Sequence, residues 1–167
     1  MWAYAYTGRP VEGLALLEEA RQDDLRTGAV GGGYVSDLRQ LSAVYLLAGR
    51  IDEAWQYACQ ALDLARQQKA RGDEARALFQ LGAVHAHASP PDAQQAEARY
   101  QEALTRAEAL GMRPLQAHCH LGLSTLYSTI GQREQARAEL SAAIDLYRAM
   151  DMTFWLPQAE AALTPGE

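Results

Sequence analysis

An internal repeat constrains the fold of this chain more than any other sequence feature. One copy of the repeated pattern comprises Leu38, Leu41, Ser42, Tyr45, Gly49, Ala54, Ala58 and Ala61. The same spacings recur later at His120, Leu123, Ser124, Tyr127, Gly131, Ala136, Leu140 and Ala143. A third copy lies between these two, and its two extra residues fall in the turn Ser89–Asp92. Such copies are expected to stack, because one short unit cannot bury its own apolar face.

The repeat organises residues 1–167 as a single array. We expect a partial unit at 1–33, three units at 34–72, 73–112 and 113–150, and a capping helix within 151–163. The partial unit is indicated by Tyr4, Gly8, Leu17 and Ala20, which match Tyr45, Gly49, Ala58 and Ala61. The glycine-rich stretch 28–33 is predicted to be a flexible connection.

Composition indicates that the repeated elements are helices. The chain contains 32 Ala and 22 Leu but only five Val and three Ile, and Ala and Leu favour helices whereas β-branched residues favour strands. Apolar and small residues also recur at helical steps of three and four. The predicted helices are 1–7, 10–27, 35–49, 51–71, 73–88, 92–110, 114–130, 133–150 and 154–163.

Glycine, proline and aspartate mark several helix ends. Gly8, Gly49 and Gly131 stand where a first helix ends in a left-handed turn, which glycine adopts without steric cost. Pro114 suits the first turn of a helix, and Asp92 is placed to cap the helix that follows Pro91.

The pattern resembles the tetratricopeptide repeat over nearly the whole chain. The matching positions are Leu41, Ser42, Tyr45, Gly49, Ala54 and Ala61 in one unit, and Leu123, Ser124, Tyr127, Gly131, Ala136 and Ala143 in another. The resemblance implies an all-α fold of antiparallel hairpins stacked into a right-handed α-solenoid. This chain departs from the family in its unit of about 40 residues, in Leu38 and His120 at the usual tryptophan position, and in lacking the proline between hairpins.

The length of the unit is similar to that in large bacterial regulators. In those proteins a helical array accompanies an ATPase module, a nucleotide cyclase or a DNA-binding domain. The phrases Ala48–Ala54 and Met152–Pro157 carry this likeness. It implies that the array is one segment of a bacterial signalling or regulatory protein.

Charge and cysteine content exclude several classes of partner and location. A net charge of −6 gives no broad basic surface for direct contact with nucleic acid or anionic lipid. No apolar run approaches the length of a membrane span, and two distant cysteines fit a reducing compartment. We therefore expect a cytoplasmic location and no membrane partner.

Candidate catalytic and metal-binding groups have simpler structural explanations. The pairs His85/His87 and His118/His120 are each two residues apart, about 200° around a helix, so the members of a pair face different ways. Cys59 and Cys119 fit a packed core, and no cofactor motif is present. We expect no enzyme activity, no metal site and no cofactor.

In the tetratricopeptide family the first helix of each hairpin lines an inner groove. By register, the groove positions of this chain are Ser36, Arg39, Gln40, Ala43, Leu47, Arg76, Phe79, Gln80, Ala83, His87, His118, Leu121, Thr125 and Ser128. None of them is a carboxylate, whereas acids are frequent on the second helices, as at Glu53, Glu97 and Glu139. Chance and an ordinary solvated outer face could produce this contrast. A more specific interpretation is a groove that binds an apolar segment with acidic character through Arg39, Arg76, Phe79 and Leu121.

These observations predict a non-enzymatic protein–protein interaction module that acts as a scaffold or sensor. A rival hypothesis is a structural element that forms homodimers through the exposed ends of the array. A third hypothesis is a helical enzyme or metal protein.

Overall fold

The computed structural model describes residue 19 and residues 34–163. Residues 34–163 form the helices α3 (Tyr34–Leu47), α4 (Ile51–Gln67), α5 (Arg71–His87), α6 (Ala93–Ala109), α7 (Arg113–Thr129), α8 (Arg133–Ala149) and α9 (Leu156–Leu163). No strand is present in this part of the chain, so the predicted all-α class is confirmed. The helices predicted at 1–7 and 10–27 and the connection at 28–33 lie outside the described residues, apart from the helical residue 19.

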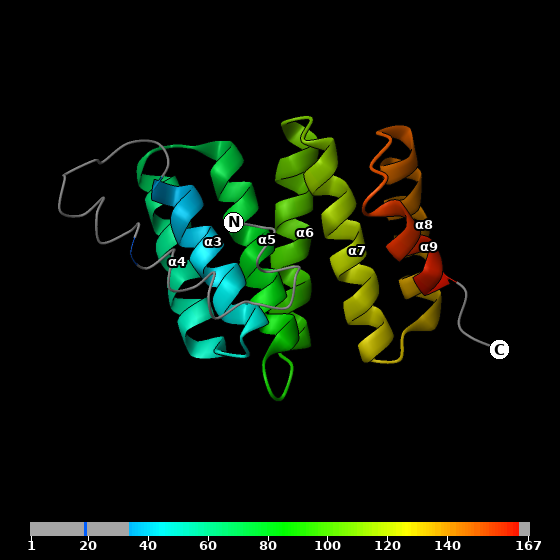
Figure 1. Cartoon of the computed structure of the whole chain (residues 1–167), viewed down its shortest axis with the longest axis horizontal. Coiled ribbons are helices and arrows are strands. Elements are labelled where there is room, and N and C mark those ends of the chain that lie inside the picture. The colour runs from blue at the N-terminus through cyan, green and yellow to red at the C-terminus, as the bar shows by residue number, and fades with distance from the viewer. Residues whose placement is uncertain (1–18, 20–33, 164–167) are drawn as a thin grey trace.

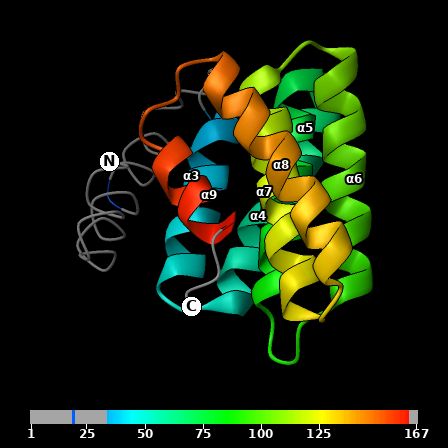
Figure 2. The same cartoon turned by 90° about the vertical axis from the view of Figure 1, so that its right-hand side faces the viewer.

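Successive helices lie side by side in chain order. Figure 1 shows α3 and α4 at one end of the stack, α5 and α6 next, then α7, and α8 with α9 at the other end. Each helix packs against the next, and α5 also contacts α3 and α7. Viewed along the stack, α6 lies at one edge while α3 and α9 lie toward the other (Figure 2). This arrangement of adjacent helical pairs is that of an α-solenoid.

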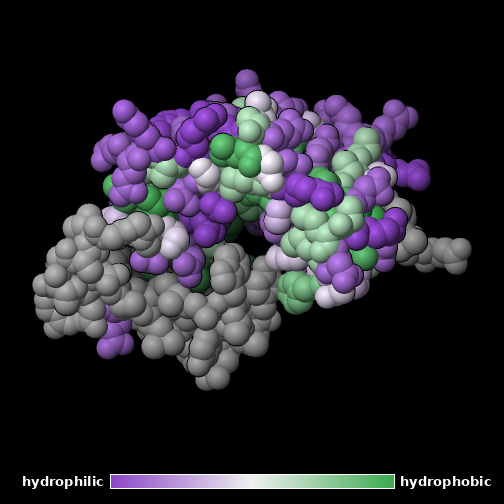
Figure 3. All heavy atoms as spheres, turned by 90° about the horizontal axis from the view of Figure 1, so that it is seen from above, coloured by the Kyte–Doolittle hydropathy of each residue, from purple (hydrophilic) through white to green (hydrophobic). Residues whose placement is uncertain are grey.

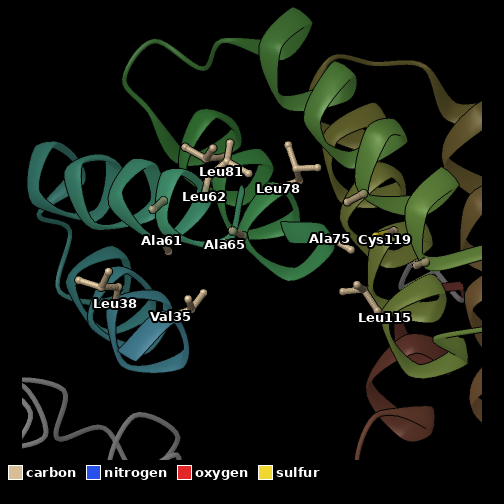
Figure 4. Close-up of a cluster of buried hydrophobic side chains, with 14 residues drawn as sticks. Val35, Leu38, Ala61, Leu62, Ala65, Ala75, Leu78, Leu81, Leu115 and Cys119 are labelled. Carbon is tan, nitrogen blue, oxygen red and sulfur yellow. The ribbon is translucent and has the colours of Figure 1, made fainter. Parts of the chain in front are cut away.

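The solenoid is held together by small residues where helices cross. Ala54, Ala61, Ala103 and Ala143 on the second helices are fully buried, and small side chains allow neighbouring helices to approach closely. Figure 4 shows one core cluster that draws side chains from α3, α4, α5, α6 and α7. The core is therefore continuous from one hairpin to the next, as expected for a stacked array.

The same type of turn ends five of the helices. Gly49, Gly111 and Gly131 have φ values of 73°, 64° and 81°, as predicted for Gly49 and Gly131. Lys69 and Asp151 adopt the same left-handed conformation, at 55° and 54°, although non-glycine residues are strained there. The helix predicted at 51–71 therefore ends at Gln67, and α5 begins at Arg71, so the predicted unit boundary between residues 72 and 73 falls within its first turn.

Among the connections between the described helices, the one from α5 to α6 has no left-handed residue. It spans residues 88–92, which includes the predicted two-residue insertion, and Figures 1 and 2 show it projecting from one edge of the stack. The backbone N–H of Gln95 donates to Asp92 Oδ1 at 3.1 Å, so the predicted cap is confirmed. Pro114 lies in the first turn of α7, also as predicted.

A tyrosine from α6 joins the second and third units. Tyr100 is 3 % exposed, and its ring lies against the backbone of α5 at Gly82 and of α7 at Gly122. A Cβ atom on either glycine would stand less than 3.0 Å from carbon atoms of that ring. Glycine at both positions therefore creates the space that the ring occupies.

An ion-pair network joins three consecutive helices. Glu74 on α5 accepts hydrogen bonds from Arg66 on α4, at 3.1 Å, and from Arg106 on α6, at 3.2 Å. Arg106 also donates to Glu102 at 3.0 Å. The Glu74 side chain is only 14 % exposed, so these interactions are less screened by solvent than ordinary surface pairs.

Candidate functional site

The predicted groove residues lie on α3, α5 and α7, and we call this set the first-helix face. Its members are Ser36, Arg39, Gln40, Ala43 and Leu47 on α3; Arg76, Phe79, Gln80, Ala83 and His87 on α5; and His118, Leu121, Thr125 and Ser128 on α7. All are at least partly exposed except Gln80. The acids Glu53, Glu97 and Glu139 lie on the second helices α4, α6 and α8.

Two arginines of this face, Arg39 on α3 and Arg76 on α5, influence each other electrostatically, and their helices are in contact. Burial lowers the pKa of Arg39, the positive charge of Arg76 lowers it further, and Asp73 raises it. Arg76 Nη1 also donates to Asp73 Oδ1 at 3.3 Å. None of the predicted positions of the first-helix face is acidic. The carboxylate of Asp73, one turn before Arg76 on α5, nevertheless lies beside this face.

Gln80 differs from the expectation of an open groove position. It is 6 % exposed, and its buried Nε2 donates to no acceptor in the structure. The repeat spacing predicts which side of α5 carries Gln80. Whether that side is exposed depends on how closely the neighbouring helices pack against α5. A buried amide group without a partner is costly.

Aromatic side chains connect α5 with the C-terminal helices. The ring centroid of His118 lies 6.2 Å from that of Phe79 and 4.8 Å from that of Trp155. A hydrogen bond of 2.8 Å joins His118 Nδ1 to the Tyr147 hydroxyl. Burial lowers the pKa of His118, so the neutral imidazole is favoured in this aromatic setting.

The two predicted apolar anchors already take part in packing. Phe79 packs against two core clusters and has its ring centroid 5.6 Å from that of Tyr100. Leu121 packs against the cluster formed mainly by α8. Each remains partly exposed, so a partner would contact the outer part of these side chains.

Several polar groups of the face are bonded to their own helix. His87 Nδ1 lies 2.8 Å from the Ala83 carbonyl oxygen, and the Thr125 hydroxyl donates to the Leu121 carbonyl at 3.0 Å. Leu47, in contrast, is 54 % exposed at the end of α3. The polar groups of His87 and Thr125 are therefore partly engaged within their own helices.

His120 and His85 each lie near a carboxylate, and Cys119 is buried. His120 Nδ1 lies 2.6 Å from Glu139 Oε2, and His85 Nδ1 lies 3.9 Å from Asp92 Oδ2. Burial raises the pKa of the Cys119 thiol to about 12, which disfavours the nucleophilic thiolate. Within the described part of the chain, no three His, Cys, Asp or Glu side chains gather as a metal site would require.

Three residues important for this face were not among its predicted positions. Asp73 could have been found from sequence, because residues three apart on a helix are neighbours and it precedes Arg76 by three. Tyr147 comes from a second helix, and Trp155 comes from the turn before α9. Their approach to His118 depends on the packing of α7, α8 and α9, for which the spacing gives no direct signal.

The surface seen from above in Figure 3 is mostly hydrophilic, with separate hydrophobic patches. No described helix combines the length and apolar character needed to cross a membrane.

No protein-family model and no curated protein matches the chain. Among solved structures it is similar to BtubC (BKLC) from P. vanneervenii, with a TM-score of 0.69 and 19 % sequence identity. The similarity covers 89 % of this chain and 60 % of BtubC. The chain thus shares the helical fold of BtubC while spanning about three fifths of its length.

Proposed function

We propose that this chain is a non-enzymatic protein–protein interaction module that binds a segment of a partner protein on its first-helix face. The observation that carries the proposal is the accessibility of this face. Three successive first helices leave a mixture of cationic, polar and apolar side chains at least partly exposed, with Gln80 as the exception. Stacked repeats gain stability from their neighbours and leave such a face available to a partner.

We also propose that the helices form a tetratricopeptide-type array with a right-handed superhelical twist. It is supported by the sequence motif and by the small residues at the helix crossings, of which Ala54 and Ala61 are fully buried. We further propose that the array is a scaffold or sensor segment of a cytoplasmic bacterial signalling protein. The likeness of Ala48–Ala54 and Met152–Pro157 to large bacterial regulators supports this assignment, and the free thiols of Cys59 and Cys119 fit a reducing compartment.

The proposal is tested by selecting random twelve-residue peptides displayed on phage against the full chain. Enriched peptides should bind in solution, and Thr125→Trp should weaken their binding by obstructing the exposed surface of α7. Ala138→Trp is the matched control, because Ala138 is also exposed but lies on the second helix α8. Equal binding to both variants, with helicity retained, would place the binding surface elsewhere.

A further inference from the structure

An aromatic contact attaches the last described helix to the rest of the array. Trp155 lies in the turn immediately before α9. Its ring centroid is 4.8 Å from that of His118 on α7, and the two ring planes are 70° apart. The Trp155 ring also lies 6.5 Å from the Tyr147 ring of α8, at an interplanar angle of 17°. Trp155 therefore joins the start of α9 to two helices at once.

The helix that Trp155 precedes is the shortest of those described. It has 8 residues, whereas α7 and α8 have 17 each, and isolated helices shorter than about 12 residues are marginal in water. Figure 1 shows α9 at the end of the stack beside α8, against which it packs. Of residues 156–162, Ala159 alone is buried, and the ion pair of Glu160 with Arg148 is exposed. The contact of Trp155 with His118 therefore matters for the attachment of α9.

Uncharged rings enclose His118. The centroid of Phe79 on α5 lies 6.2 Å from that of His118, and the Tyr147 hydroxyl lies 2.8 Å from its Nδ1. Burial lowers the pKa of His118, because the charged imidazolium would lose water here. The neutral imidazole is therefore the form that suits this enclosure.

The charged residues of the surrounding elements do not compensate a charge on His118. The residues three and four positions away from it on α7 are uncharged. Burial is the cause that lowers its pKa, and no charged side chain of residues 34–163 contributes to the shift. The charged residues on the elements around it are Arg76 on α5, Glu108 on α6, Asp145 and Arg148 on α8, and Asp151 and Glu160 on either side of Trp155.

Protonation of His118 would favour a structure that lets water reach the imidazolium. Phe79 and Tyr147 belong to helices of 17 residues that contribute to buried clusters. Trp155, in contrast, moves with a helix of 8 residues at the end of the stack. Local opening is drawn from the least stable parts of a fold. Displacement of Trp155 together with α9 is therefore the least costly way to hydrate His118.

We propose that His118 and Trp155 form an acid-sensitive latch, which holds α9 against the array while His118 is neutral and releases it when His118 is protonated. Release uncovers the apolar cluster to which Ala117, Ile144 and Tyr147 belong. This regulation is additional to partner binding on the first-helix face and does not depend on it.

The latch loses strength below the pH at which a solvated histidine titrates. That pKa is about 6.5, and the latched state binds the proton less readily because burial lowers the pKa of His118. The full strength of the latch is therefore present above about pH 6.5. As the pH falls further, the equilibrium shifts toward release by up to about tenfold per pH unit, until the latched His118 is itself protonated.

Hydrogen exchange of the full chain, measured by mass spectrometry at about pH 5.5 and about pH 7.5, tests the latch. Rates are corrected for the intrinsic effect of pH on amide exchange. The protection of α9 should be up to about tenfold lower at the acidic pH. It should also stay below the protection of α5 at both pH values, because local opening exposes α9 alone.

Two matched variants locate the effect. His118→Asn should abolish the loss of α9 protection in acid, because asparagine does not titrate. His87→Asn is the control and should preserve the loss, because His87 is exposed and bonded to the Ala83 carbonyl of its own helix. NMR of the unchanged chain gives a check that needs no variant. The titration of the His118 ring and the change in the Trp155 indole signal should share one midpoint, below about pH 6.5.

Several results would overturn the latch. Constant or higher protection of α9 in acid would show that Trp155 holds the imidazolium as well as the imidazole, as a cation–π contact can. Equal protection of α9 and α5 would mean that both exchange by unfolding of the whole chain. A loss that persists in His118→Asn, or separate midpoints for His118 and Trp155, would assign the acid response to another group.

Discussion

The packing of Tyr100 between two glycines makes Gly82→Ala a sensitive test of how the array is joined. Alanine usually stabilises a helix relative to glycine by about 0.8–1.0 kcal/mol. At this position its Cβ atom would stand 2.7 Å from Cδ1, 2.9 Å from Cε1 and 3.0 Å from Cγ of the Tyr100 ring. The steric effect therefore opposes the intrinsic preference of the helix.

The steric effect is expected to exceed the gain from helix propensity. Overpacking of a well-filled core costs about 1–3 kcal/mol. Tyr100 is 3 % exposed, and Gly122 of α7 confines the same ring, so the ring has little freedom to move aside. We therefore take the upper part of this range, about 2–3 kcal/mol, and after the gain in helix propensity is subtracted we expect Gly82→Ala to lower the free energy of unfolding by about 1–2 kcal/mol. For a chain of this size, that corresponds to a fall of about 2–8 °C in the melting temperature.

Gly72→Ala is a matched control in the same helix. Its Cβ atom would meet Arg76 Nη1 at 3.5 Å and the sulfur of Met112 at 3.8 Å, which are ordinary van der Waals contacts. This variant should therefore be neutral or more stable by up to about 1 kcal/mol. Two identical substitutions on α5 are expected to differ in the sign of their effect.

Both variants are measured by thermal and urea unfolding monitored by circular dichroism. Tyr100→Leu provides a further check, because removing the ring should abolish most of the penalty of Gly82→Ala. A similar effect of alanine at positions 72 and 82, or an undiminished penalty in the Tyr100→Leu background, would refute the reasoning.

Other features of the structure give predictions that can be checked on the same chain. Glu74→Gln should lower the free energy of unfolding by about 1–2 kcal/mol, because it weakens a shared acceptor of two arginines; urea titration at low and high salt measures the loss, and an unchanged midpoint at low salt would contradict it. Lys69→Gly should raise the stability by up to about 1 kcal/mol, because it relieves a left-handed conformation, and a lower melting temperature would argue against strain there. Because burial lowers the pKa of His118 below its unfolded value, the unfolded state binds the proton more readily, so stability should fall as the pH drops below about 6.5; His118→Asn should show a weaker pH dependence of the melting temperature, and an identical profile would be contrary evidence. In the native chain a thiol reagent should modify Cys59 well before Cys119, which is fully buried and has its pKa raised to about 12; mass spectrometry identifies the modified residue, and equal rates would show that Cys119 is accessible.

The helices and their order followed from sequence because repeat spacing and turn residues agreed. Gly49 and Gly131 marked helix ends that the structure confirms. The prediction overran at the end of α4, since the run before Arg71 contains no glycine and Lys69 ends the helix instead. A left-handed lysine has no reliable sequence signature, because intrinsic preference opposes that conformation.

The candidate site was predictable as a face but not as a set of contacts. Register placed Arg39 and Arg76 on first helices that prove to be neighbours. It could not show that Gln80 is buried, because burial depends on how closely the surrounding elements approach α5. The contact of His118 with Tyr147 joins residues 29 apart on different helices, and so depends on tertiary packing that helical periodicity does not encode.

The shared geometry of the turns has a consequence for how an array like this one can change in length. Left-handed residues at positions 49, 69, 111, 131 and 151 recur every twenty residues except across the α5–α6 connection, so the turn within a hairpin is the same as the turn between hairpins. Adding or removing one helix with its turn would preserve the turn geometry between the remaining helices. It would, however, turn every later first helix into a second helix, and every later second helix into a first helix. The acid-rich helices would then take the positions of the present first helices. Growth or loss by two helices at a time is therefore the change that would keep the proposed binding face.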